Sequence, residues 1–218
     1  MADRWATFDC YGTLIDWNGG IGAALAAVFG EDDGSLLRYH ELEPVVEAER
    51  YRTYREVLDT VLALLAEERG FALAEQQRTA LSRSLPDWPA FPDVPNGLRE
   101  ARRRGWRLAA LSNCDRDLLE ASIERLGVPF DHVVVAQDVR SYTPAHAHWE
   151  RFFTDTGARR SRHVHVAQSL FHDIVPCREL GLRSVWINRL GEAPGPEPDR
   201  ELPDLTGLAD ALDGLVAA

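Results

Sequence analysis

One short stretch near the start of the chain decides the fold: Trp5-Ala6-Thr7-Phe8-Asp9-Cys10-Tyr11-Gly12-Thr13. Its first four residues are typical of a short buried strand, which we expect to end at Asp9. The residues that follow predict a loop, because Gly12 supplies the backbone freedom that a tight turn requires. A carboxylate at such a junction is either a nucleophile or a cap for the turn, and its position alone leaves both interpretations open.

Strands and helices alternate in the second half of the chain. Four further strands are predicted at 106–111, 132–136, 163–167 and 183–188. Helices are predicted at 115–126, 145–156, 174–180 and 205–216. This alternation predicts an α/β fold with a doubly wound parallel sheet, whose ligands sit at the carboxyl ends of the strands. The residues at those ends are Asp9, Ser112, Asn113, 138–143 and 168–173.

The segment 16–90 has a different sequence pattern, because it contains no convincing strand. Apolar residues at helical spacing predict helices over 21–29, 41–69 and 74–85. The proline-rich stretch 86–92 predicts a hinge. We therefore expect a core domain made of residues 1–15 and 91–218 and a helical domain made of residues 16–90. The tail 191–203 is rich in Pro, Gly and Glu and is expected to be an exposed loop.

Composition narrows the class of protein and its partners. The 218 residues carry a formal net charge of -11, which disfavours nucleic acid and anionic membranes as partners. All 24 basic residues are arginine, so no mechanism can use a lysine. Three cysteines indicate reduced thiols, and we expect no signal peptide after Met1 and no apolar run of ~20 residues that could span a membrane. A cytoplasmic protein is expected, with a homodimer left open.

Several motifs together resemble those of the haloacid dehalogenase superfamily, and more narrowly its L-2-haloacid dehalogenase (type II) branch. The first motif is Phe8-Asp9-Cys10-Tyr11-Gly12-Thr13-Leu14 and the second is Leu111-Ser112-Asn113. The third lies at 139–144, the fourth at 167–173, and Val185-Trp186-Ile187-Asn188-Arg189 is similar to the strand that follows in this branch. The resemblance runs from about residue 5 to residue 215, and the segment 16–90 stands where the family has its cap.

The resemblance implies a Rossmannoid core with an inserted α-helical cap and a covalent ester on Asp9. Thr13, Ser112 and Asn113 would donate hydrogen bonds to Asp9 or to a substrate carboxylate, and Asp173 is retained in the fourth motif. A cap arginine would receive the leaving halide. The candidates are Arg38, Arg50, Arg52 and Arg55, of which Arg52 and Arg55 are expected on one helix face. The residues expected to contact substrate are Tyr11, Arg52, Arg55, Thr143, Ser169 and His172.

The sequence also departs from the family pattern. Tyr11 stands where phosphatase members have a second Asp, and Ala167-Gln168 replaces their Gly-Asp pair, which argues against phosphoryl transfer and against a bound metal. Magnesium is expected only if the protein is a phosphatase. Thr143 replaces the family lysine that keeps the nucleophile ionised. Arg140 could move in, but its guanidinium is larger and planar, so the exchange is not conservative. Gln168 and Leu170 replace polar residues of the fourth motif.

Histidines near the motifs have two readings each. His172 could serve as a base for the hydrolytic water or have a structural role. His163 and His165 lie on one strand face and could bind a metal, although a core position is favoured because no third ligand is evident nearby.

Three hypotheses follow. The first is a 2-haloacid dehalogenase that acts on a small carboxylate-bearing substrate. The second is a phosphatase or another displacement reaction on the same fold. The third is a catalytically impaired homologue, for which the Thr143 substitution is the strongest support.

Overall fold

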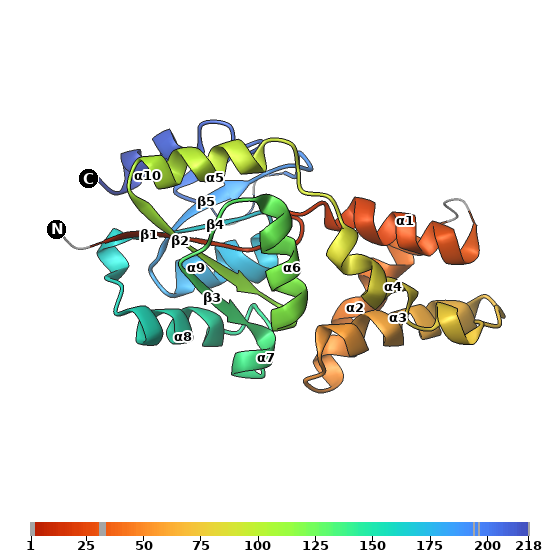
Figure 1. Ribbon diagram of the computed structural model, residues 1–218. Coiled ribbons are helices and arrows are strands. Elements are labelled where there is room, and N and C mark those ends of the chain that lie inside the picture. The colour runs from red at the N-terminus through yellow and green to blue at the C-terminus, as the bar shows by residue number, and fades with distance from the viewer. Residues whose placement is uncertain (1–2, 31–33, 194, 196, 218) are drawn as a thin grey trace.

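A six-stranded parallel sheet forms the centre of the computed structural model, which describes residues 3–30, 34–193, 195 and 197–217 (Figure 1). The strands lie in the order β3-β2-β1-β4-β5-β6. Their bounds are Arg4–Phe8 (β1), Trp106–Ser112 (β2), His132–Val135 (β3), His163–Ala167 (β4), Arg183–Ile187 (β5) and Arg200–Leu202 (β6). β1 is central and pairs with β2 and β4. The predicted doubly wound α/β fold is confirmed.

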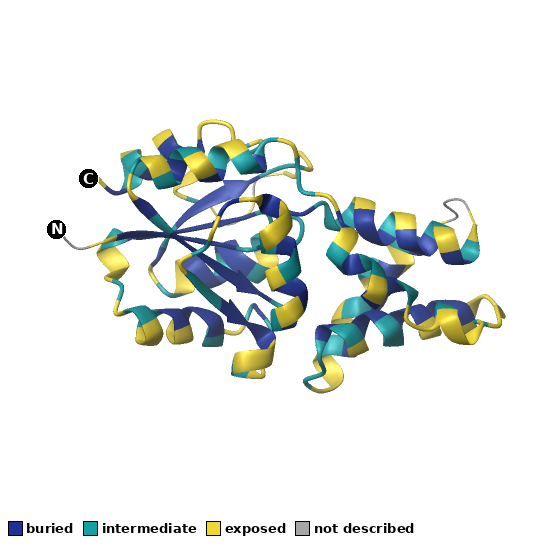
Figure 2. Cartoon of the chain, viewed as in Figure 1, coloured by how far each residue is buried: buried dark blue, intermediate teal, exposed yellow. Residues whose placement is uncertain are grey.

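Helices cover both faces of this sheet. One face, which carries Phe8, packs against α5 (Val94–Arg103), α6 (Arg116–Leu126) and α10 (Leu208–Leu215). The other face, which carries Trp5, packs against α8 (Ala147–Thr156) and α9 (Val175–Glu179), while α7 (Ala136–Val139) follows β3. The strands are buried along most of their length and the helices alternate between buried and exposed positions (Figure 2). Burial of both faces explains why these strands read as apolar runs.

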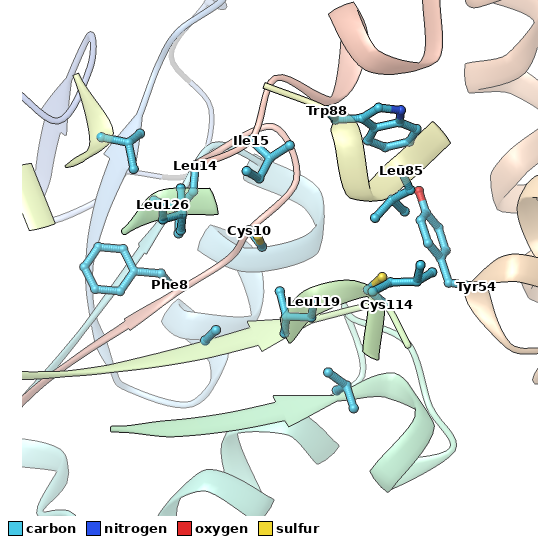
Figure 3. Packing of buried hydrophobic residues seen from close by; sticks show 14 of the residues in the cluster. Phe8, Cys10, Leu14, Ile15, Tyr54, Leu85, Trp88, Cys114, Leu119 and Leu126 are labelled. Atoms are coloured by element: carbon cyan, nitrogen blue, oxygen red, sulfur yellow. The ribbon is translucent and has the colours of Figure 1, made fainter. Parts of the chain in front are cut away.

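The segment after β1 forms four helices that lie together beside the sheet (Figure 1). They are α1 (Trp17–Phe29), α2 (Ser35–Glu49), α3 (Tyr54–Glu68) and α4 (Ala80–Ser84). Their apolar faces join the core of the sheet, because Tyr54 of α3 lies near Cys114 in the same hydrophobic cluster (Figure 3). The residues that follow β1 and β2 are therefore covered by this helical layer.

Several predicted boundaries were wrong. The helix expected over 41–69 is two helices, because Arg50 is extended and Thr53 begins α3 with a capping box to Glu56. The helix expected over 74–85 is the short α4 with a 3-10 turn before it and another after it.

Two elements were not predicted. The first is α5, which contains Gly97, and a glycine inside a helix weakens the helical signal. A larger residue does not fit at this position, because a Cβ atom there would stand 2.8 Å from Leu205 Cβ. The second is β6, which lies within the predicted loop 191–203. Residues 194 and 196 of that loop are outside the described residues, and so are Met1 and Ala2 at the start of the chain. In the part of the chain that the structure describes, no helix is long and apolar enough to cross a membrane.

Candidate active site

Asp9 stands where the chain leaves the central strand β1. Its main-chain N–H donates to Val166 O at 3.1 Å, so β4 holds the backbone at this point. The side chain is half-buried and lines a cleft of about 610 Å³ between the sheet and the helical layer. The predicted site residues that line this cleft are Asp9, Tyr11, Ser112, Asn113, Thr143, Ser169, His172 and Asp173. They gather because the carboxyl ends of parallel strands share one edge of the sheet.

Thr13 holds the Asp9 carboxylate in one orientation. The Thr13 hydroxyl donates to Asp9 Oδ2 at 2.6 Å and accepts from the Gln168 main-chain N–H at 2.9 Å. The second bond fixes the direction of the first, since the hydroxyl proton is left to point at the carboxylate. The carboxyl group also accepts a main-chain hydrogen bond from Cys10, and Oδ1 has no side-chain donor among the described residues.

Arg189 is the arginine whose side chain lines the cleft, but its guanidinium is already bonded to other groups of the protein. It donates to the Thr13 carbonyl at 2.9 and 3.1 Å and to Asp93 at 2.8 and 3.1 Å, and its guanidinium lies over the Phe91 ring. Arg189 thus braces the loop that carries Thr13. Sequence reasoning placed it in the strand that follows the fourth motif and gave it no role, although it follows a strand at the ligand edge of the sheet.

Asn113 organises the loop that carries Thr143. The Asn113 side chain accepts from the Thr143 main-chain N–H at 2.7 Å and donates to the Thr143 carbonyl at 3.4 Å. The place of the family lysine is therefore held by a buried threonine. Arg140 is exposed, lies 5.9 Å from the Tyr51 ring and does not line the cleft.

Ser112 has a hydroxyl oxygen that is buried and has no hydrogen-bond partner. The residue is only 2% exposed and lines the cleft. Buried polar atoms in proteins are nearly always hydrogen-bonded. An unsatisfied hydroxyl at the floor of a cleft is a donor available to a bound molecule.

Tyr11, Ser169 and His172 also line the cleft. The Tyr11 hydroxyl lies 3.0 Å from Ser122 Oγ, and its ring stacks with that of Tyr54 at 6.3 Å. Burial raises the pKa of Tyr11 well above 10, so this residue stays neutral. Ser169 Oγ accepts from the His172 main-chain N–H at 3.0 Å, and burial lowers the pKa of His172.

Arg52 and Arg55 do not line the cleft. Arg52 precedes α3, so the two arginines do not share a helix face as expected. Arg52 donates to Val46 O and Glu49, and its main chain exchanges hydrogen bonds with the Tyr142 hydroxyl. Arg55 pairs with Asp117 at 2.7 Å. Both lie where the helical layer joins the core.

The cleft is acidic. Its lining contains one arginine, Arg189, and six carboxyl groups, which are those of Asp9, Asp16, Glu43, Glu47, Asp173 and Glu192. Burial and the charge of Asp173 raise the pKa of Asp9 to about 8, against the donation from Thr13. Burial raises the pKa of Asp173 to about 8. A small anion bound here must rely on neutral donors, because the one guanidinium is already neutralised.

The residues present do not fit a magnesium site. Within the described ranges, no group of three His, Cys, Asp or Glu side chains is arranged to hold a metal ion. Hard cations require several oxygen ligands, and Gln168 stands where phosphatase members have an Asp. His163 and His165 are both fully buried and bond to Thr7. They occupy the core position that the sequence favoured.

The arrangement defines a class of protein, an α/β domain with a helical insertion after its first strand and a carboxylate at that strand's end. A family model described as haloacid dehalogenase-like hydrolase matches residues 4–181, and the chain belongs to this family of hydrolases.

Individual relatives agree with this assignment. An (S)-2-haloacid dehalogenase from Pseudomonas sp. strain YL is 29% identical over 216 residues, covering 94% of this chain and 93% of the relative. A phosphoserine phosphatase from Thermus thermophilus is 31% identical over 169 residues, covering 75% of this chain and 66% of the relative. The structure of an L-2-haloacid dehalogenase from Xanthobacter autotrophicus with chloropropionic acid covalently bound matches the fold with a TM-score of 0.85 at 20% identity, covering 97% of this chain and 99% of that one.

Proposed function

We propose that this hydrolase cleaves the carbon–halogen bond of a small 2-haloacid through an ester on Asp9. One observation carries the proposal: Asp9 ends the central strand, is oriented by Thr13 and opens into a cleft whose polar floor has the unsatisfied Ser112 hydroxyl. The relatives that are named 2-haloacid dehalogenases, one of them with a chloropropionic acid covalently bound, support the same reaction.

In the first step Asp9 Oδ1 attacks the substrate carbon that bears the halogen. A carbon–oxygen bond forms while the carbon–halogen bond breaks, and the halide leaves with the bonding electron pair. The Ser112 hydroxyl and main-chain N–H groups of the cleft would hold the substrate carboxylate without a cation. Thr13 keeps Oδ2 in place, so that Oδ1 faces the substrate.

In the second step water adds to the carbonyl carbon of the Asp9 ester. The water gives one proton to Asp173, which lines the same cleft. The tetrahedral intermediate then expels the 2-hydroxy acid, whose alkoxide oxygen takes that proton back. The net reaction consumes one water and releases one halide and one proton, and Asp9 is restored.

Halide release from a panel of 2-haloacids tests the proposal. We expect release that EDTA does not reduce, loss of turnover in Asp9→Asn, and normal turnover in the matched control Asp87→Asn, whose carboxylate is exposed and pairs with Arg125. Absence of halide release from the whole panel, or unchanged release in Asp9→Asn, would overturn it.

A phosphatase is the second candidate, because the chain is also similar to a phosphoserine phosphatase. Phosphate release from phosphomonoesters that EDTA abolishes and magnesium restores would favour this candidate over the first. Tyr11 argues against it, since a buried neutral tyrosine cannot replace the acid–base carboxylate of phosphatase members. A chain with neither activity would support the hypothesis of an impaired homologue.

A further inference from the structure

A chain of four buried polar side chains leads from the cleft into the sheet. Asp173 Oδ1 lies 3.0 Å from His165 Nε2, and His165 Nδ1 lies 2.8 Å from Thr7 Oγ1. Thr7 Oγ1 also lies 2.8 Å from His163 Nε2. Thr7 and both histidines are fully buried, and Asp173 is 3% exposed. Neither step of the reaction as written above uses Thr7, His163 or His165.

Only one assignment of donors and acceptors along these hydrogen bonds leaves no buried N–H group without an acceptor. His163 Nδ1 is buried and has no partner. If it carried the proton, a buried donor would be left unsatisfied, which is rare in proteins and costly. His163 therefore carries its proton on Nε2 and donates to Thr7. Thr7 then donates to His165 Nδ1, and His165 donates from Nε2 to Asp173.

We propose, as an extension that rests on the function proposed above, that His165 is a positioning residue that presents Asp173 to the hydrolytic water as a hydrogen-bond acceptor, with Thr7 and His163 locking its tautomer. The donated N–H favours the ionised carboxylate, which is the form that can take a proton from water. Because Oδ1 is engaged, Oδ2 is the oxygen left for the water.

The charges around the chain explain why a neutral imidazole suits this place. The titratable groups that face His165 are Asp9, Asp173, His163 and, from α8, His148, which bonds to Ser112 O. Burial lowers the pKa of His165 to about 4, so the ring is neutral and contributes an N–H dipole. The protein contains no lysine that could pair with Asp173. Among the described residues, His165 is the side chain that donates an N–H to this carboxyl group.

NMR of the unmodified protein tests the direction of the chain and needs no substrate. In isotope-labelled protein we expect His163 and His165 both to carry the proton on Nε2. The carboxyl signal of Asp173, assigned with Asp173→Asn, should titrate about one pH unit higher in His165→Phe than in the wild type. A proton on His165 Nδ1, or an unchanged titration of Asp173, would overturn the proposal.

Kinetics with 2-chloropropionate test the consequence for turnover. In His165→Phe the ester hydrolysis should slow about tenfold, so that kcat and KM fall together, kcat/KM changes little and the Asp9 ester accumulates in the intact mass. His165→Gln keeps a donor near the Nε2 position and should recover much of kcat. Thr7→Val should resemble His165→Phe, while Thr7→Ser should resemble the wild type.

The two readouts separate the two proposals. If the wild-type protein releases no halide but the tautomers and the Asp173 titration are as expected, the proposed function fails, while the hydrogen-bond chain and its effect on Asp173 stand. If halide is released normally by His165→Phe with an unshifted pH profile, the positioning role fails and the proposed function stands.

Discussion

Asp9 is a carboxylate in surroundings that stabilise its charge poorly. It receives one hydroxyl donor from Thr13 and faces a lining with six carboxylates, its own included. Because its pKa is about 8, only a small fraction of Asp9 is ionised at neutral pH. As long as the pH is below the pKa, this fraction increases about tenfold for each unit by which the pH is raised. A nucleophile of this kind gives a rate that rises with pH until the group is fully ionised.

The Thr13 hydroxyl offers the sharpest single-residue test of this environment. Thr13→Val removes the donor to Asp9 Oδ2, and a hydrogen bond to a charged group is worth about 1.5–3 kcal/mol. We therefore expect kcat/KM for 2-chloropropionate at neutral pH to fall at least about tenfold, with the midpoint of the pH profile moved upward. Thr13→Ser keeps the hydroxyl and should stay near wild type; equal losses in both variants would contradict the role.

Thr143 is the second position at which one residue should matter. Thr143→Lys restores an ammonium group beside the nucleophile, which should lower the pKa of Asp9 and raise the rate of haloacid hydrolysis at neutral pH. Thr143→Met is an uncharged control of similar length and should give no gain. If lysine also gives no gain in halide release, the cleft has been rebuilt around another substrate.

At the scale of elements, the join between α3 and the core is made by a carboxylate from the loop after β2. Asp115 is buried and accepts the main-chain N–H groups of Tyr54 and Arg55 at 3.0 and 3.1 Å. These are among the free N–H groups of the first turn of α3, which otherwise lack partners. A residue of the core therefore caps a helix of the inserted layer and ties that helix to the loop after β2.

Asp115→Ala should destabilise the protein by about 1–2 kcal/mol, the usual cost of losing a helix cap. Asp117→Ala is the matched control. Its carboxylate is 65% exposed and pairs with Arg55 on the surface, so its loss should cost less than about 1 kcal/mol. Urea unfolding of both variants measures the difference. Equal destabilisation by the two variants would be inconsistent with the capping role.

Elements with strong local signals could be predicted from the sequence, and those defined by distant partners could not. Asp9, Ser112 and Asp173 gather in the cleft because each follows a strand of one parallel sheet, which periodicity reveals. The Arg55 side chain pairs with Asp117 and the Arg52 main chain bonds to Tyr142, and no local pattern links these segments. β6 is only three residues long, Arg200-Glu201-Leu202, and lies at a sheet edge, so its signal is weak.

At the scale of the whole molecule, four carboxyl groups with raised pKa values shape the pH response above about pH 7, whereas histidines with lowered pKa values act in the opposite sense below it. The pKa values of Asp9, Asp173 and Glu47 are raised to about 8 and that of Glu43 to about 7, chiefly by burial. In the unfolded chain these groups have ordinary values of 3.8 or 4.5. Between the two values the native state binds more protons than the unfolded state.

Above about pH 7, where histidines are largely neutral in both states, the free energy of unfolding should therefore fall as pH rises to about 8.5. The sign follows from the raised pKa values, since stability that depends on a bound proton is lost when the proton leaves. Denaturant unfolding at several pH values measures this slope. Glu47→Gln removes one of the four groups and should make the slope shallower. A stability that rises over this range would contradict the burial of these carboxyl groups.

The ester on Asp9 is tested most directly by a single turnover in heavy-oxygen water, with enzyme in excess over 2-chloropropionate. Water that attacks the ester leaves its oxygen on the enzyme, so fragmentation of the peptide that contains Asp9 should locate the heavy oxygen in that side chain, and the first 2-hydroxy acid formed should carry ordinary oxygen. Heavy oxygen in the product, with none in Asp9, would mean that water attacks the substrate directly.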